Sequence, residues 1–152
     1  MMDQFFDIKE QHPDTILFFR MGDFYELFHD DAEVAADVLG LSLTSRDKNA
    51  EEPIPMAGFP WHGLQDHLRT MLRAGYKVTV AEQEKELRPG AKLLERVVTR
   101  VYTPGSLFEE GLLEGNEQSL LGAVVLEKDA LGLAVIDAST GKAWASTHRG
   151  HD

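Results

Sequence analysis

Residues 16–28 read ILFFRMGDFYELF, and this run determines how the first part of the chain folds. Its two halves, ILFFR at 16–20 and FYELF at 24–28, are rich in the aromatic and β-branched residues that strands prefer. A Gly-Asp pair lies near their junction, and such a pair is typical of the tight turn in a β-hairpin. We therefore predict a hairpin that turns at Gly22 and Asp23.

The second half of this hairpin places an aromatic ring and a carboxylate on one face. In an extended strand, residues i and i+2 point the same way, so Phe24 and Glu26 project together while Tyr25 points to the opposite side. In a helix, the two side chains would diverge by roughly 200°. An apolar wedge beside a hydrogen-bonding group is suited to opening a base step and binding the displaced base. From residue type alone, the alternative is a buried Phe24 and a solvated Glu26 at a strand edge.

The composition is that of an ordinary globular protein. The 152 residues indicate one domain, or one domain and a fragment, and 43% hydrophobic residues provide a sizeable core. The absence of cysteine excludes disulfides and thiolate zinc sites and is compatible with a reducing compartment. We find no apolar run of about 18 residues and no signal peptide, so we expect a soluble cytoplasmic protein.

The net charge of −11 argues against a stand-alone nucleic-acid clamp. Phosphate contacts normally require a basic face. Residues 1–104 carry 12 Lys+Arg and 18 Asp+Glu, and residues 105–152 carry 3 and 8, so both parts are acidic. If DNA is the partner, this chain would inspect bases while another part of a larger protein holds the backbone.

Apolar periodicity and turn residues predict the other elements of the first part. We expect helices at 2–11, 29–39 and 61–72, strands at 41–44, 76–81 and 96–102, and polar loops at 45–53 and 84–93. We expect an amphipathic strand at 76–81, because Tyr76, Val78 and Val80 alternate with Lys77, Thr79 and Ala81. The core should include Phe5, Phe6, Phe18, Phe19, Met56 and Trp61.

The last third of the chain differs in character. Residues 105–117 read as a linker with glycines and glutamates, and residues 118–152 contain three strand candidates: SLLGAVVL, LGLAVID and GKAWAST. Three strands without covering helices would leave one sheet face open. We therefore expect an incomplete second domain.

The order of six sequence blocks carries a family resemblance. MGDFYELFHDDA, LSLTSR, EEPIPMAGFPWH, AEQ, ERVVTRVYTPGSL and GLAVIDASTG follow one another as in the amino-terminal part of the MutS family of DNA mismatch-repair proteins. The resemblance covers nearly the whole chain. It implies an α+β mismatch-recognition domain at 1–104, a mixed β-sheet with packed helices. For 118–152 it implies the truncated start of a connector domain, an incomplete ribonuclease H-like β-meander.

The resemblance also assigns roles to residues. Phe24 would insert from the minor groove against a mispaired or unpaired base, and Glu26 would hydrogen-bond that base. Arg46 and Arg96 would contact the DNA backbone. The other expected DNA-binding positions are Met21, Gly22, Asp23, Pro60 and His62.

The chain departs from the family pattern in two places. Trp61 and Gly63 stand where many relatives have tyrosine and alanine, and the loop EKELRPGAKL lacks the usual Gly-Asp-Pro and Lys-Gly elements. The Phe-x-Glu motif is intact.

For the full-length family, the resemblance implies a homodimer that binds ATP and Mg²⁺ through other segments and works with downstream mismatch-repair partners. Gly141-Lys142 does not complete a phosphate loop, because Ala143 replaces the required Ser or Thr. We expect no cofactor and no enzymatic activity from these residues.

Two other classes of function stay open. The chain could be a structural or protein-interaction module of a divergent MutS paralogue. It could instead be an acidic, nuclease-like domain, since hard cations prefer oxygen ligands. Candidate ligands for such a metal are Asp23, Glu26, Asp30 and Asp31, and more weakly His62, Asp66 and His67, but the change from strand to helix scatters the first set.

Overall fold

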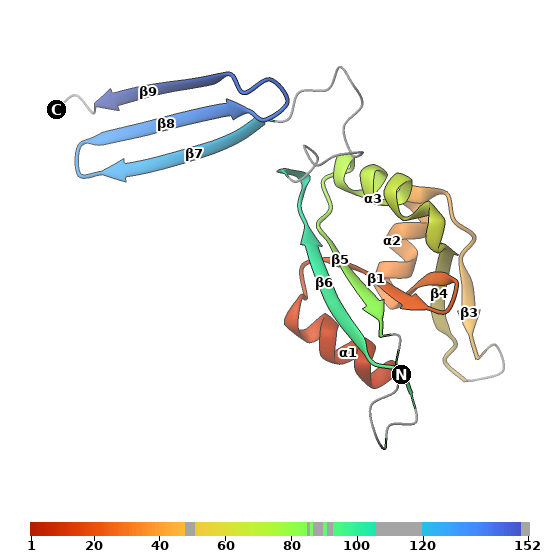
Figure 1. Cartoon of the computed structure of the whole chain (residues 1–152). Helices are drawn as coiled ribbons and strands as arrows, with labels where there is room; N and C mark the ends of the chain where they lie inside the picture. The colour runs from red at the N-terminus through yellow and green to blue at the C-terminus, as the bar shows by residue number, and fades with distance from the viewer. Residues whose placement is uncertain (48–50, 85, 87–89, 91–92, 106–119, 150–152) are drawn as a thin grey trace. The chain divides into compact units, whose positions relative to one another are not determined.

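A computed structural model of the chain describes residues 1–47, 51–84, 86, 90, 93–105 and 120–149. The chain divides into two compact units, 1–104 and 105–152 (Figure 1). The helices of the first unit are α1 (Met2–Gln11), α2 (His29–Leu39) and α3 (Leu64–Arg73), with a 3-10 turn η1 (Trp61–Gly63) before α3. Its strands are β1 (Ile16–Met21), β2 (Phe24–Phe28), β3 (Thr44–Arg46), β4 (Ile54–Pro60), β5 (Val78–Gln83) and β6 (Arg96–Tyr102).

The predicted hairpin is present. Strands β1 and β2 pair antiparallel up to Met21 and Phe24, which leaves Gly22 and Asp23 as the turn. Gly22 has a φ of 59°, a conformation that glycine adopts without steric cost. The hairpin therefore ends in a two-residue turn directly before Phe24.

The hairpin lies at the centre of a mixed six-stranded sheet with the order β3-β4-β2-β1-β5-β6. Strands β1 and β5 run parallel, and the other neighbours run antiparallel. This confirms the expected α+β class, a mixed sheet with packed helices.

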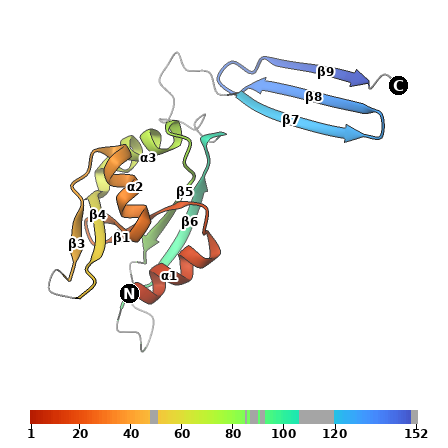
Figure 2. The ribbon, with the colours of Figure 1, turned by 180° about the vertical axis from the view of Figure 1, so that it is seen from behind.

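Each face of this sheet packs against different helices. On the α3 face, the rings of Phe18, Tyr25 and Phe59 contact one another, and the Phe59 ring centroid lies 4.2 Å from that of His67 in α3. Helix α2 lies beside α3 (Figures 1 and 2). The opposite face, here the α1 face, packs against α1, whose Phe5 ring lies 5.7 Å from Phe19 and 5.2 Å from Phe28.

Strand β4 was not predicted from the sequence. Two prolines and Gly58 lower its strand preference, yet it pairs with β2 on one side and β3 on the other. The predicted strand at 41–44 is wrong, because β3 begins only at Thr44 and its pairing with β4 extends to Arg46 and Ile54. Pairing with β4 therefore sets the position of β3.

The expected core is correct for Phe5, Phe18 and Phe19, which are buried, and Met56 is partly buried. Two expectations are wrong: Phe6 is 50% exposed and Trp61 is 52% exposed. Adjacent helix residues point in directions about 100° apart, so burial of Phe5 turns Phe6 outward. Trp61 lies in η1, before the apolar stripe of α3 begins.

The prediction of an amphipathic strand at 76–81 is also wrong, because β5 begins at Val78 and buried and exposed side chains do not alternate along it. Residues 78–81 are all buried, because β5 pairs with β1 and β6 and both of its faces are covered. One face packs against α3, and the other packs into the core on the α1 face, here called the α1 cluster, which consists of Phe5, Ile8, Leu17, Phe19, Phe28 and Ala81. Strand β6 at 96–102 and the helices at 2–11 and 29–39 agree with the prediction. The helix predicted at 61–72 is η1 followed by α3.

The second unit contains the three predicted strands, β7 (Leu120–Glu127), β8 (Ala130–Asp137) and β9 (Ala143–Arg149), as an antiparallel sheet. Asp137 stabilises the turn after β8, because its carboxylate accepts hydrogen bonds from Ser139 and Thr140. The likeness to ribonuclease H stays a prediction.

Nearly all of the predicted linker falls at 106–117, outside the described residues. In the part of the chain that the structure describes, no helix is long and apolar enough to cross a membrane.

Candidate nucleic-acid interface

Phe24 and Glu26 lie on the α1 face of the sheet, at the end of the hairpin. Phe24 is 47% exposed, Glu26 is half-buried and Phe28 is fully buried against Phe5. Burial thus increases along one face of β2 as the strand passes from the turn towards α1. The residues combine an exposed ring with a carboxylate held close to the apolar core.

The neighbours of Glu26 determine its electrostatics. Its cross-strand partners are Phe19 of β1 and Gly58 of β4, so its neighbour on one strand is an aromatic ring and its neighbour on the other has no side chain. Burial raises the pKa of Glu26, and the positive charges of Arg46 and Arg96 act in the opposite direction. The neutral acid is therefore more accessible in Glu26 than in an ordinary glutamate.

Arg46 and Arg96 lie on either side of Glu26, on the same face. The guanidinium carbon of Arg46 lies 5.9 Å from the ring centroid of Phe28, and that of Arg96 lies 5.5 Å from the ring centroid of Phe19. The structure thus gathers the two predicted arginines, Glu26 and Phe24 on one surface.

The two arginines differ in how they are held. Arg96 donates hydrogen bonds to the Arg20 carbonyl at 3.1 Å, the Leu94 carbonyl at 2.7 Å and Gln83 Oε1 at 2.8 Å. Arg46 approaches the Met1 sulfur at 3.5 Å and the Asp47 carboxylate at 3.9 Å, both weak contacts. Arg46 therefore keeps more capacity to bind a further group, whereas Arg96 braces the protein.

The backbone of the hairpin turn is tied to its surroundings. The Gly22 N–H donates to Gln83 Oε1 at 3.3 Å, and the Gly22 carbonyl accepts a hydrogen bond from Arg20 Nε. The Asp23 carbonyl accepts a hydrogen bond from the Trp61 N–H at 2.9 Å. The residue before the turn, Met21, packs against the α1 cluster.

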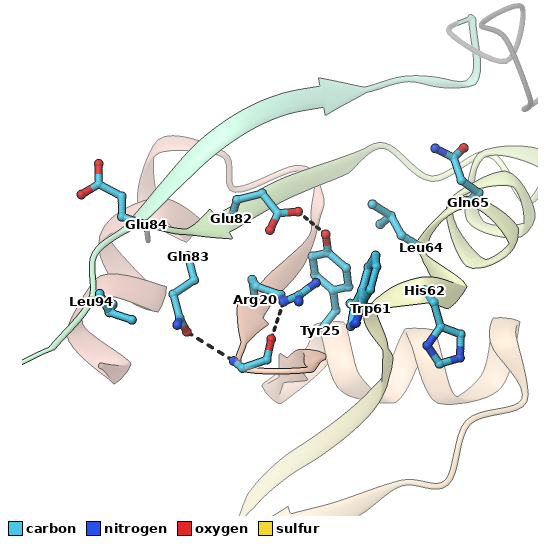
Figure 3. Close-up of a pocket in the computed structure, with 11 residues that line it drawn as sticks. Arg20, Tyr25, Trp61, His62, Leu64, Gln65, Glu82, Gln83, Glu84 and Leu94 are labelled. Carbon is cyan, nitrogen blue, oxygen red and sulfur yellow. Dashed lines mark hydrogen bonds between the residues drawn. The ribbon is translucent and has the colours of Figure 1, made fainter. Parts of the chain in front are cut away.

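A cavity of about 710 Å³ adjoins the turn, and several of its lining side chains, including Arg20 and Tyr25, point to the α3 face. The guanidinium carbon of Arg20 lies 5.3 Å from the ring centroids of both Tyr25 and Trp61 (Figure 3). The Tyr25 hydroxyl hydrogen-bonds to Glu82. His62 lines this cavity, whereas Pro60 pairs with Phe24 in the sheet, so these two predicted positions lie in different surroundings.

Sequence reasoning missed three residues that shape this surface. Gln83 binds the turn, Gly58 lets β4 approach the Tyr25 carbonyl closely, and Trp61 binds the Asp23 carbonyl through its backbone N–H. The glycine within a hydrophobic run, MAGF, was the one available signal, since an isolated glycine in a strand often marks a close approach. Among the described residues, no three or more acidic or histidine side chains gather in a way that could hold a metal.

A family model described as MutS domain I matches residues 1–111. The chain belongs to the MutS family. Its membership agrees with the mixed sheet and the three helices of the first unit.

Relatives in this family include proteins named DNA mismatch repair protein MutS. The one from Streptococcus agalactiae is 46% identical over 95% of this chain, and the one from Syntrophomonas wolfei is 43% identical over all of it. The one from Leptospira interrogans is 43% identical over 97%. The chain spans 17–18% of the length of these MutS relatives.

Proposed function

We propose that residues 1–104 recognise mispaired or unpaired bases in double-stranded DNA, as part of mismatch repair. Family membership and the names of the relatives support this. The observation that carries the detailed proposal is the half-exposed Phe24, on the same face as Glu26 and directly after a tethered turn. In this proposal Phe24 inserts from the minor groove, and Glu26 binds the displaced base.

A single aromatic wedge can detect faulty pairing in any sequence. Opening a base step costs a few kcal/mol, and the cost is smallest where pairing is already defective. The minor groove offers a degenerate pattern of acceptors, so it supports little sequence readout. The energy of deformation, and not base identity, would therefore distinguish a mismatch from a perfect duplex.

Glu26 would act in two ways. As a neutral acid it can donate a hydrogen bond to a base, and as a carboxylate it can only accept one. Burial already raises its pKa, and nearby phosphates would raise the pKa further, because negative neighbours disfavour ionisation. The ionised form would repel an intact duplex that offers no hydrogen bond in return.

The acidic chain would depend on other segments for affinity. Arg46 would contact the backbone, Arg96 would do so while bracing the turn, and Met21, Asp23, Pro60 and His62 would lie near the groove. From the family resemblance, we further propose that a longer protein dimerises, clamps DNA and binds ATP with Mg²⁺ outside residues 1–152. This protein would act in the cytoplasm with downstream mismatch-repair partners.

The test uses a chimera of the Streptococcus agalactiae relative that carries residues 1–104 of this chain in place of its own matching segment. Fluorescence anisotropy gives Kd for a duplex with one unpaired thymine and for the perfect duplex. Base–aromatic stacking is worth about 1–3 kcal/mol, so Phe24→Ala should lower the preference for the unpaired base by about fivefold or more.

Phe6→Ala is the matched control, because Phe6 is 50% exposed but lies on α1. It should leave the preference unchanged. A chimera that binds both duplexes equally would overturn the proposed function. A preference that survives in Phe24→Ala would overturn the wedge.

A further inference from the structure

Gln83, the last residue of β5, joins the hairpin turn to the other half of the sheet. Its side-chain oxygen accepts two hydrogen bonds, from the Gly22 N–H at 3.3 Å and from Arg96 Nη2 at 2.8 Å. Arg96 is itself fixed by the carbonyls of Arg20 and Leu94. The chain of contacts therefore runs from β6 through Gln83 to the turn.

We propose that Gln83 is a positioning residue for Phe24, holding the hairpin turn so that the ring points out of the sheet before DNA arrives. The inference rests on the proposed function. Gly22 lies two residues before Phe24, and the Gln83 oxygen is the side-chain acceptor of its N–H. Without that acceptor, the Gly22 N–H would bind only water.

The other two contacts of the turn involve carbonyl groups. Arg20 Nε donates to the Gly22 carbonyl and the Trp61 N–H donates to the Asp23 carbonyl. Gln83 is thus the contact that ties the turn to β5 and β6, across β1. Loss of this contact frees the turn on one side without removing a core side chain, because Gln83 is only half-buried.

A fixed turn matters only for the complex in which the ring is inserted. Ordering a loose segment on binding consumes affinity, so a preorganised wedge binds a defective site more tightly. A perfect duplex, into which the ring does not insert, gains nothing from this order. Gln83 therefore affects the ratio of the two affinities more than the affinity for perfect DNA.

Two substitutions separate the acceptor from the shape of the side chain. Gln83→Met keeps the length and removes the oxygen, whereas Gln83→Glu keeps an oxygen that can accept from both Gly22 and Arg96. In the chimera, Gln83→Met should lower the preference for the unpaired base about three- to tenfold, for a net hydrogen-bond contribution of about 0.5–1.5 kcal/mol. Gln83→Glu should restore most of it, and Gln65→Met, at another residue lining the cavity, should change nothing.

A second readout needs no DNA. In the 152-residue chain, ¹⁵N relaxation at Gly22 and Asp23 should show order parameters that fall from about 0.85 towards 0.6 in Gln83→Met but not in Gln83→Glu. A turn that stays rigid in Gln83→Met, or a chimera whose preference survives that change, would overturn the positioning role. The two experiments can also disagree. If the turn loosens in Gln83→Met but the unmutated chimera does not prefer the unpaired base, Gln83 does anchor the turn, and it is the proposed function that is overturned.

Discussion

Glu26 of β2 and Gly58 of β4 are cross-strand partners, and the close approach of the β2 backbone leaves no room for a side chain at Gly58. A Cβ atom at position 58 would lie 2.9 Å from the Tyr25 carbonyl oxygen and 3.6 Å from Glu26 Cγ. We expect Gly58→Ala to lower the free energy of unfolding by about 1–3 kcal/mol, the usual cost of overpacking. Urea unfolding followed by circular dichroism measures this.

Gly122→Ala provides the control for this change. Gly122 also lies within a strand, β7, but a Cβ there would have no atom within 4 Å. The free energy of unfolding should then change by less than about 0.5 kcal/mol. Equal losses in the two variants would contradict a close approach at Gly58.

Phe24 and Phe28 should differ sharply in their effect on stability, although they share one face of one strand. Phe28→Ala removes a fully buried ring in contact with Phe5 and should cost about 3–5 kcal/mol. Phe24→Ala removes a half-exposed ring and should cost less than about 1 kcal/mol. Thermal unfolding of both variants checks this, and a large loss in Phe24→Ala would place that ring in the core.

Local signals predicted the hairpin well, because its evidence lies within the segment. The Gly-Asp turn and the alternation of FYELF fix both the strand and the common direction of Phe24 and Glu26. The same reasoning failed for β4, whose prolines and glycine disfavour a strand. Pairing with β2 and β3 overrides these preferences, and a single sequence does not show such pairing.

The candidate site was predictable in its residue types but not in its connections. The resemblance named Arg46 and Arg96, yet their positions on either side of Glu26 depend on the strand order. The role of Gln83 depends on a contact across 61 positions of sequence. Tertiary contacts of this kind leave no local pattern.

The Lys9–Asp31 pair should stabilise the fold in a pH-dependent way. Asp31 is buried, and its carboxylate accepts from Lys9 Nζ at 2.7 Å and from the Leu17 N–H at 2.9 Å. Lys9→Met leaves this charge without its partner and should cost about 3 kcal/mol at neutral pH. Burial raises the pKa of Asp31, so protonation neutralises the group as the pH falls. The cost should therefore shrink in urea unfolding experiments near pH 3.

Lys77→Met is the control, because Lys77 pairs with Asp14 and both side chains are largely exposed. An exposed pair contributes about 0–1 kcal/mol, so this variant should lose little stability. If both variants lose the same small amount, Asp31 does not need a counter-charge.

Glu26→Gln should change the dependence of stability on pH. Because burial raises the pKa of Glu26 above its usual 4.5, the folded protein binds a proton more tightly than the unfolded chain does. The favourable contribution of Glu26 is present below pH 4.5 and is lost as the pH rises through the raised pKa. Glutamine does not ionise, so the variant keeps this contribution at every pH. Its Tm should therefore be higher than that of the unmutated chain at pH 7, and the difference should disappear at pH 4. Glu33→Gln, which alters an exposed carboxylate of α2, controls for a general charge effect.

The same substitution should weaken the discrimination against perfect DNA. In the chimera, Glu26→Gln should retain binding to the unpaired base, because the amide can still donate and accept hydrogen bonds. It should also bind the perfect duplex about two- to fivefold more tightly, since removing one repulsive charge is worth about 0.5–1 kcal/mol. Anisotropy titrations at two salt concentrations measure both affinities, and the gain should shrink at the higher salt because ions screen the repulsion. An affinity for perfect DNA that does not change would mean that the ionised Glu26 does not repel the duplex, and its role would then be limited to binding the displaced base.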